Sequence, residues 1–91
     1  MNQSELDILA ENLTQIRNRL RYTQKDIAQE LGISNHQIVA LETGTGNARI
    51  DTAVAICGVY GISLRSALKK DFWQTYFKKV PEKGIGDVND A

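Results

Sequence analysis

A single glycine, Gly32, divides residues 23–44 (TQKDIAQELGISNHQIVALETG) into two short helical patterns. Glycine enters the left-handed backbone region freely, so it can end one helix and let the chain turn directly into the next. Thr23 and Asp26 resemble a capping box at the start of the first helix, and Ser34 is placed to cap the second. The stretch therefore predicts two helices joined by a short turn.

The apolar residues of this stretch fall in the register of a helix-turn-helix. That motif needs a small residue where its helices cross, a turn that often contains glycine, and apolar side chains on both helices that face one core. Counted from Gln24 as the first position, Ala28 is the fifth and Gly32 the ninth, and Gly44 follows the second helix as its stop. Positions four, eight, ten, fifteen and eighteen are all apolar: Ile27, Leu31, Ile33, Ile38 and Leu41. This joint pattern is a stronger signal than helical periodicity alone.

The segments on either side also predict helices, so the expected fold class is all-α. Residues 6–20 carry an apolar stripe at helical spacing, with Ser4 as the expected N-cap and an end near Tyr22. Residues 50–60 are apolar nearly all round, which indicates a helix buried on more than one side. Gly58 lies inside that helix, where glycine is unfavourable, and this predicts a close contact with a neighbouring helix.

The C-terminal part predicts a fifth helix and a helical extension. Gly61 is expected to end the preceding helix and Ser63 to cap the fifth. The predicted organisation is a helix-turn-helix domain over residues 1–70, an extension over 71–80 and a flexible tail over 81–91. The extension is marked by aromatic residues at helical spacing, namely Phe72, Trp73, Tyr76 and Phe77.

These aromatic rings raise the question of what they pack against. A five-helix unit closes its core by Leu68, which leaves limited room for four more rings. We therefore predict that they pack the extension onto a second subunit and form a homodimer. The alternative is that the rings fold back on the first helix of the same chain, at Leu6, Leu9 and Leu13.

Composition points to one small domain of the cytoplasm. The chain has 91 residues, of which 42% are hydrophobic, enough for a single folded core. It has no apolar run long enough for a membrane helix, and its acidic N-terminus differs from a signal peptide. Cys57 is the only cysteine, so no internal disulfide can form, and we expect an inert thiol in the core.

The sequence contains no recognisable catalytic constellation. There is no nucleophile–base pair, carboxylate dyad or phosphate-binding glycine loop, so we expect neither enzymatic activity nor a cofactor. His36 is the only histidine and Cys57 lies on a different helix, so no metal site is expected. The net charge is zero, but residues 13–50 carry +2, a balance that permits nucleic-acid binding without requiring it.

Three stretches together resemble the phage repressor and Cro-like helix-turn-helix domains, the xenobiotic-response-element family of bacterial regulators. They are "TQKDIAQELGIS", the "LETG" that ends the next helix, and "ARIDTAVAICGVYGIS". The resemblance covers about residues 8–68. It implies a five-helix, lambda-repressor-like domain that binds operator DNA, usually as a symmetric dimer, with its third helix in the major groove.

The resemblance also implies roles for individual residues. Gln24 corresponds to a glutamine that contacts phosphate and can brace the third helix, while Arg17 and Glu42 correspond to an ion pair between the first and third helices. Asn35 and His36 take the places that meet base edges, where asparagine suits adenine. The full set expected to contact DNA is Gln24, Lys25, Ser34, Asn35, His36, Gln37, Val39, Ala40, Thr43, Asn47 and Arg49.

The loop after the third helix departs from the family, because Arg49 is its only charged residue and relatives are often more basic there. Each neutralised phosphate adds about 0.9 to the slope of log affinity against log salt, so we expect a shallow slope and weak binding by one subunit. Binding should then depend on a dimer that spans two half-sites about 34–36 Å apart.

The resulting hypothesis is a cytoplasmic, homodimeric regulator that represses transcription from a palindromic operator in double-stranded DNA. The main alternative is an antitoxin or another regulator that captures a protein partner such as a toxin. A third reading is a protein-interaction module that does not bind DNA. At single positions simpler readings also stay open, with His36 on an inert solvated surface and Gln24 as a mere helix starter.

Overall fold

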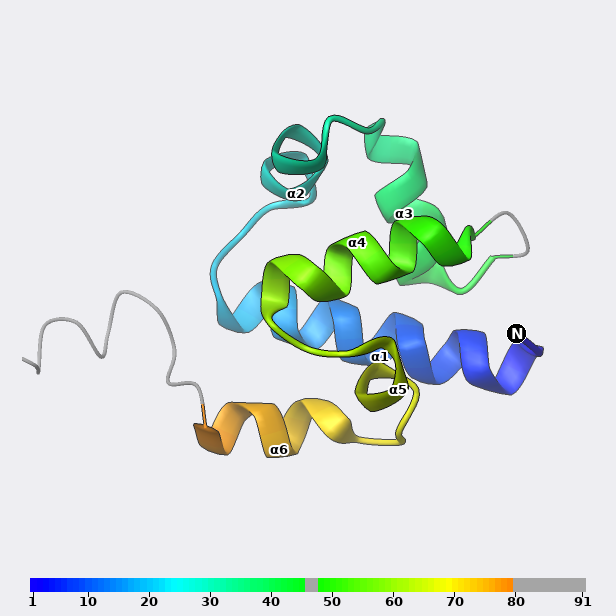
Figure 1. Cartoon of the computed structure of the whole chain (residues 1–91), viewed down its shortest axis with the longest axis vertical. Coiled ribbons are helices and arrows are strands. Elements are labelled where there is room, and N and C mark those ends of the chain that lie inside the picture. Colours follow the sequence, from blue (N-terminus) through cyan, green and yellow to red (C-terminus); the bar gives the residue numbers. More distant parts are fainter. Residues whose placement is uncertain (46–47, 80–91) are drawn as a thin grey trace, which may run out of the picture.

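In the computed structural model of the chain, residues 1–45 and 48–79 are described, and they form six helices (Figure 1). The described ranges contain no strand, which confirms the all-α prediction. The helices are α1 (Gln3–Arg19), α2 (Gln24–Leu31), α3 (Asn35–Thr43), α4 (Ile50–Tyr60), α5 (Leu64–Ala67) and α6 (Phe72–Lys79). Asn47, Val80 and the predicted tail over 81–91 lie outside the described residues.

The first helix begins and ends earlier than predicted. Its N-cap is Asn2, not Ser4: the Asn2 side chain accepts from the backbone N–H of Glu5 at 2.8 Å, and the Glu5 carboxylate accepts from the N–H of Asn2 at 3.0 Å. This capping box explains why Asn2 rather than Ser4 is the N-cap, because Glu5 is the third helical residue after Asn2. The helix ends at Arg19 rather than near Tyr22.

The turn signals between the next helices are confirmed. Thr23 and Asp26 form the predicted capping box, with hydrogen bonds of 3.0 and 2.8 Å. Gly32 and Gly44 end α2 and α3 in the left-handed region, at φ +66° and +68°. Ser34 is the N-cap residue of α3, but its side chain makes no capping hydrogen bond.

The expected helix contact at Gly58 is wrong. Gly58 is exposed, and a Cβ atom built on it would meet nothing within 4 Å. It lies four and eight residues after Val54 and Ile50, which are 53% and 56% exposed, so all three share the outer face of α4. The inner face of α4 is buried through Thr52, Ala53, Ile56, Cys57 and Tyr60.

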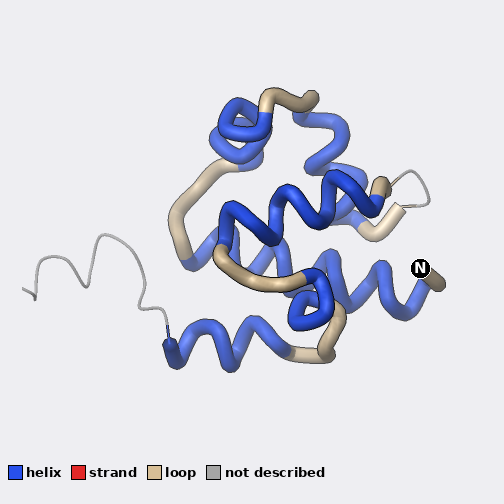
Figure 2. Tube along the Cα trace, in the orientation of Figure 1, coloured by secondary structure: helices blue, strands red, loops and turns tan. Residues whose placement is uncertain are grey.

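The core is built around α1, which contacts α3, α4, α5 and α6. Figure 2 shows α4 and α6 on opposite sides of α1, with short loops between successive helices. Side chains from all six helices of the described ranges share one cluster, and its largest fully buried members are Leu9, Leu13, Ile16, Ile27, Ile38, Leu41 and Ile56. None of the helices in the described ranges is both long and apolar enough to cross a membrane.

The C-terminal helix packs on the same chain. Ser63 caps α5 as predicted, accepting from the N–H of Ser66 at 3.1 Å. Tyr76 is buried, and its hydroxyl donates to the backbone oxygen of Tyr60 at 3.1 Å. Phe72, Trp73 and Phe77 are half-buried against the core cluster, which contains Leu9 and Leu13 of the intrachain alternative but not Leu6.

Two ring contacts involve α6, one within the helix and one that joins it to α1. Trp73 and Phe77 meet edge to face with their ring centroids 5.2 Å apart. The guanidinium of Arg19 lies 4.5 Å from the centroid of the Phe77 ring, within the range of a cation–π contact. Parts of both rings stay exposed to solvent.

Candidate nucleic-acid interface

The third helix is attached to the first by an ion pair. Arg17 donates from Nε and a terminal nitrogen to the two carboxylate oxygens of Glu42, at 2.7 and 3.0 Å, and also to the backbone oxygen of Tyr22 at 2.7 Å. The two side chains are 13% and 5% exposed. The hydrogen bond to Glu42 raises the pKa of Arg17. This confirms the predicted pair, whose two-point geometry fixes orientation as well as distance.

Gln24 joins the same network from the start of α2. Its Nε2 donates to the Glu42 carboxylate at 3.1 Å, so the side chain braces α3 from the neighbouring helix. Phosphate contact by Gln24 stays a prediction. Lys25, the next residue, is exposed.

The beginning of α3 presents three polar side chains to solvent. Ser34, Asn35 and His36 are all exposed, and none of them makes a side-chain hydrogen bond to any residue in the described ranges. Their donors and acceptors are therefore available to an external partner. The three residues are adjacent at the N-terminal end of α3, the end of a recognition helix that contacts base edges.

The second turn of α3 is more mixed. Val39 is half-buried, and Thr43 is exposed, with its hydroxyl donating to the Val39 backbone oxygen at 2.8 Å. Ala40 differs from the prediction that it contacts DNA. It is only 5% exposed, so its methyl group offers a partner almost no surface. The chain folds back at this point, because Thr45 donates to the Ala40 backbone oxygen through both its N–H and its hydroxyl.

Gln37, another predicted contact residue, has an intramolecular partner on α4. The hydroxyl of Thr52 on α4 donates to Gln37 Oε1 at 3.0 Å. Gln37 is half-buried, whereas Thr52 is buried. Sequence reasoning missed Thr52, because the two residues are fifteen positions apart and no local pattern links them.

The charge of Arg49 is matched by Asp51. Both side chains are exposed, and two hydrogen bonds of 3.1 and 2.9 Å join the guanidinium to the carboxylate. The hydrogen bond raises the pKa of Arg49 and lowers that of Asp51. Asp51 was also missed, although an acidic residue in the first turn of a helix is a recognisable signal. Arg49, the one charged residue expected in this loop, therefore lies beside the negative charge of Asp51.

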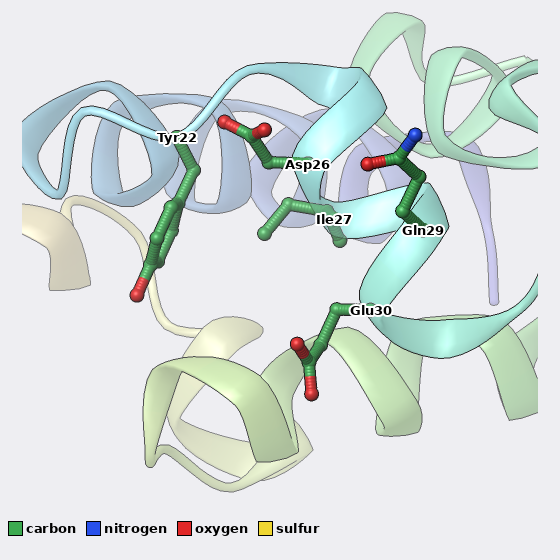
Figure 3. A pocket seen from close by; sticks show the side chains of 5 residues that line it. All are labelled: Tyr22, Asp26, Ile27, Gln29 and Glu30. Carbon is green, nitrogen blue, oxygen red and sulfur yellow. The ribbon is translucent and has the colours of Figure 1, made fainter.

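A second surface, beside α2, is acidic. Asp26, Ile27 and Glu30 help to line a hollow of about 470 Å³. Figure 3 shows Asp26 and Glu30 on either side of Ile27. The backbone hydrogen bond from Thr23 lowers the pKa of Asp26, so its carboxylate is charged at neutral pH. Negative charge there disfavours phosphate, and this favours the start of α3 as the face that meets DNA.

More than half of the chain matches a known protein family. A family model described as helix-turn-helix matches residues 13–66, more than half of the chain. The match begins in α1 and ends in α5, so it includes the Arg17–Glu42 pair, the turn at Gly32 and the whole of α3 and α4. Comparisons with curated proteins and with solved structures found no match.

Proposed function

The chain belongs to the Cro/CI-like, or xenobiotic-response-element, family of helix-turn-helix proteins, and from this premise we propose that it represses transcription from a palindromic operator as a homodimer. Membership makes it a DNA-binding transcription regulator of this type. The repressor role, the palindrome, the homodimer and a cytoplasmic location are our proposal.

One observation carries the proposal: the side chains of Ser34, Asn35 and His36 are exposed at the start of α3 and hydrogen-bond to no described residue, while the Arg17–Glu42 pair holds that helix in place. Asparagine can bond adenine through both its oxygen and its nitrogen, and a neutral histidine offers one donor or one acceptor. A rigid helix with free polar groups at its N-terminal end is suited to reading base edges.

The homodimer is proposed because one subunit has little charge with which to hold DNA. Arg49 is paired with Asp51, so the phosphate contribution of one subunit is small and affinity must come from two half-sites. The proposed contact between subunits is α6, where Phe72, Trp73 and Phe77 stay half-exposed. Tyr76 is buried in the core of its own chain.

Selection from randomised double-stranded DNA tests the regulator role. The wild-type protein should enrich an inverted repeat, and a half-site alone should bind at least tenfold more weakly. Replacing both Asn35 and His36 with alanine should abolish the enrichment without changing the melting temperature, because both side chains are exposed. Asn18→Ala, at an exposed position of α1, is the matched control and should behave as the wild type. Failure of the wild type to enrich any sequence would refute the proposal.

Light scattering during size-exclusion chromatography tests the homodimer. Wild-type protein at micromolar concentration should have the mass of two chains. Trp73→Ala combined with Phe77→Ala should give a helical protein of half that mass. Circular dichroism is the folding control, because both rings also pack on their own chain. A wild-type monomer at these concentrations would rule out the proposed dimer.

A second candidate, a regulator that captures a protein partner such as a toxin, is favoured by the apolar outer face of α4. Ile50 and Val54 are the two large apolar side chains of this helix that remain exposed. If the face binds a partner, Val54→Asp should abolish stoichiometric co-purification from the host while leaving DNA binding intact. Purification of the wild type without any stoichiometric partner would exclude this candidate.

A further inference from the structure

The contact between Thr52 and Gln37 joins a buried residue to a predicted reader of DNA. Thr52 is 6% exposed, so its side chain offers a base almost no surface. Its hydrogen bond to Gln37 Oε1, at 3.0 Å, crosses from α4 to α3. Both residues line a surface hollow of about 450 Å³, together with Arg49 and Asp51.

Thr52 is itself held in one place. Its backbone N–H donates to Asp51 Oδ1 at 2.9 Å, and the same carboxylate binds Arg49. Threonine in a helix adopts two rotamers at its first side-chain torsion, and the hydrogen bond to Gln37 favours the one seen here. Thr52 is therefore tied to Asp51 through its backbone and to Gln37 through its hydroxyl.

This contact changes what the amide of Gln37 offers to a partner. A glutamine amide has an accepting oxygen and a donating nitrogen, and the usual pairing with adenine uses both. Here the oxygen is directed to Thr52, whereas Nε2 has no hydrogen-bond partner within the described part of the chain. The amide is oriented to donate, and the major-groove edge of guanine offers two acceptors, O6 and N7.

We propose that Thr52 is a positioning residue that makes Gln37 prefer guanine to adenine. The inference rests on the proposed function, since it requires α3 to read DNA. It adds a determinant of specificity that lies on α4, outside the helix that enters the groove. Gln37 would touch the base, and Thr52 would act only through Gln37.

The test compares three substitutions of Thr52 by selection from randomised DNA followed by sequencing. Thr52→Val has nearly the same shape but no hydroxyl, Thr52→Ala is a smaller variant without the hydroxyl, and Thr52→Ser retains it. The same selection with Gln37→Ala identifies the base pair that residue 37 contacts, because this variant should lose its base preference at that pair alone. At that pair the wild type and Thr52→Ser should favour guanine over adenine by about fivefold, the low end for one specific contact.

Loss of the hydroxyl should free the amide to turn. Thr52→Val and Thr52→Ala should therefore lower the guanine-to-adenine ratio about fivefold at that pair and leave the preferences at other pairs unchanged. A merely structural role for Thr52 would weaken binding to all sequences alike. A wild-type preference for adenine, or an unchanged ratio in both variants, would overturn the inference while the regulator role stands. If the wild type enriches no sequence, the proposed function itself fails.

Discussion

The side-chain oxygen of Asn12, in the middle of α1, accepts a hydrogen bond of 3.0 Å from the backbone N–H of Trp73, near the start of α6. The amide nitrogen of Asn12 donates to the backbone oxygens of Ala67 and Lys69, at 2.7 and 2.8 Å. Asn12 is completely buried. One amide thus satisfies three backbone groups around the corner between α5 and α6.

We predict that Asn12→Leu destabilises the protein by about 2–4 kcal/mol, because it leaves two backbone oxygens and one N–H without their partner. Urea denaturation monitored by circular dichroism measures the free energy of unfolding. Asn18→Ala, an exposed change in the same helix, is the control and should cost less than about 0.5 kcal/mol. Equal effects of the two substitutions would contradict a special role for Asn12.

Glu42→Gln should lower the free energy of unfolding by about 2–4 kcal/mol, since it leaves the largely buried Arg17 without a compensating charge. Thermal and urea unfolding measure the loss. Asp51→Asn breaks the other ion pair, whose members are exposed, and should leave the free energy of unfolding almost unchanged. If Glu42→Gln were as mild as Asp51→Asn, the Arg17–Glu42 pair would not anchor α3.

Asp51→Asn should instead strengthen DNA binding. It removes the charge that neutralises Arg49, and a freed arginine that meets one phosphate steepens the slope of log affinity against log salt by about 0.9. Fluorescence anisotropy with the selected operator, at several salt concentrations, gives this slope. Asp71→Asn removes the same charge from the loop before α6, which Figure 1 shows on the other side of α1 from α2 and α3. That control should leave the slope unchanged, and an equal slope in both variants would argue against phosphate contact by Arg49.

Stability should fall in alkaline solution because of Cys57. Burial raises the pKa of its thiol from 9.0 to about 11. A group with a raised pKa stabilises the folded state below the pKa of the unfolded chain, and this contribution is lost as the pH rises through the folded value. We expect a loss on the order of 2 kcal/mol between pH 9 and 11.

Urea unfolding of the wild type and Cys57→Ala over this pH range checks the prediction. The variant is less stable at pH 7, because it loses buried atoms, but its stability should fall less steeply above pH 9. Burial also raises the pKa of Tyr60, so some alkaline loss should persist in the variant. Parallel curves for the two proteins would show that the thiol does not contribute.

The parts of the fold that depend on local chemistry could be predicted from the sequence. Gly32 and Gly44 end their helices because the chain adopts a left-handed backbone at both positions, and glycine adopts it most readily. The Thr23–Asp26 box involves residues only three positions apart. The N-cap of α1 was missed because Asn2 and Ser4 are both good caps. The deciding residue is Glu5, which completes a box only with Asn2.

Contacts between distant segments could not be predicted in the same way. The Arg17–Glu42 pair was expected only through resemblance to a family, and the contact between Gln37 and Thr52 had no sequence signal. Asn12 did leave a trace, since it lies three residues after Leu9 and four before Ile16, at the edge of an apolar stripe. A polar residue at such a place needs partners, but the sequence does not say that they come from α5 and α6.

The three hydrogen bonds of the Asn12 amide also set an order of events during synthesis. Trp73 is synthesised 61 residues after Asn12. At 5–20 residues per second this is a delay of roughly 3–12 seconds. Throughout that interval the Asn12 oxygen lacks its Trp73 partner, so the N-terminal helix cannot take its final surroundings. The nascent chain therefore completes its interior only when α6 emerges, and a ribosome that stalls before that helix leaves an unfinished core exposed to proteases and chaperones.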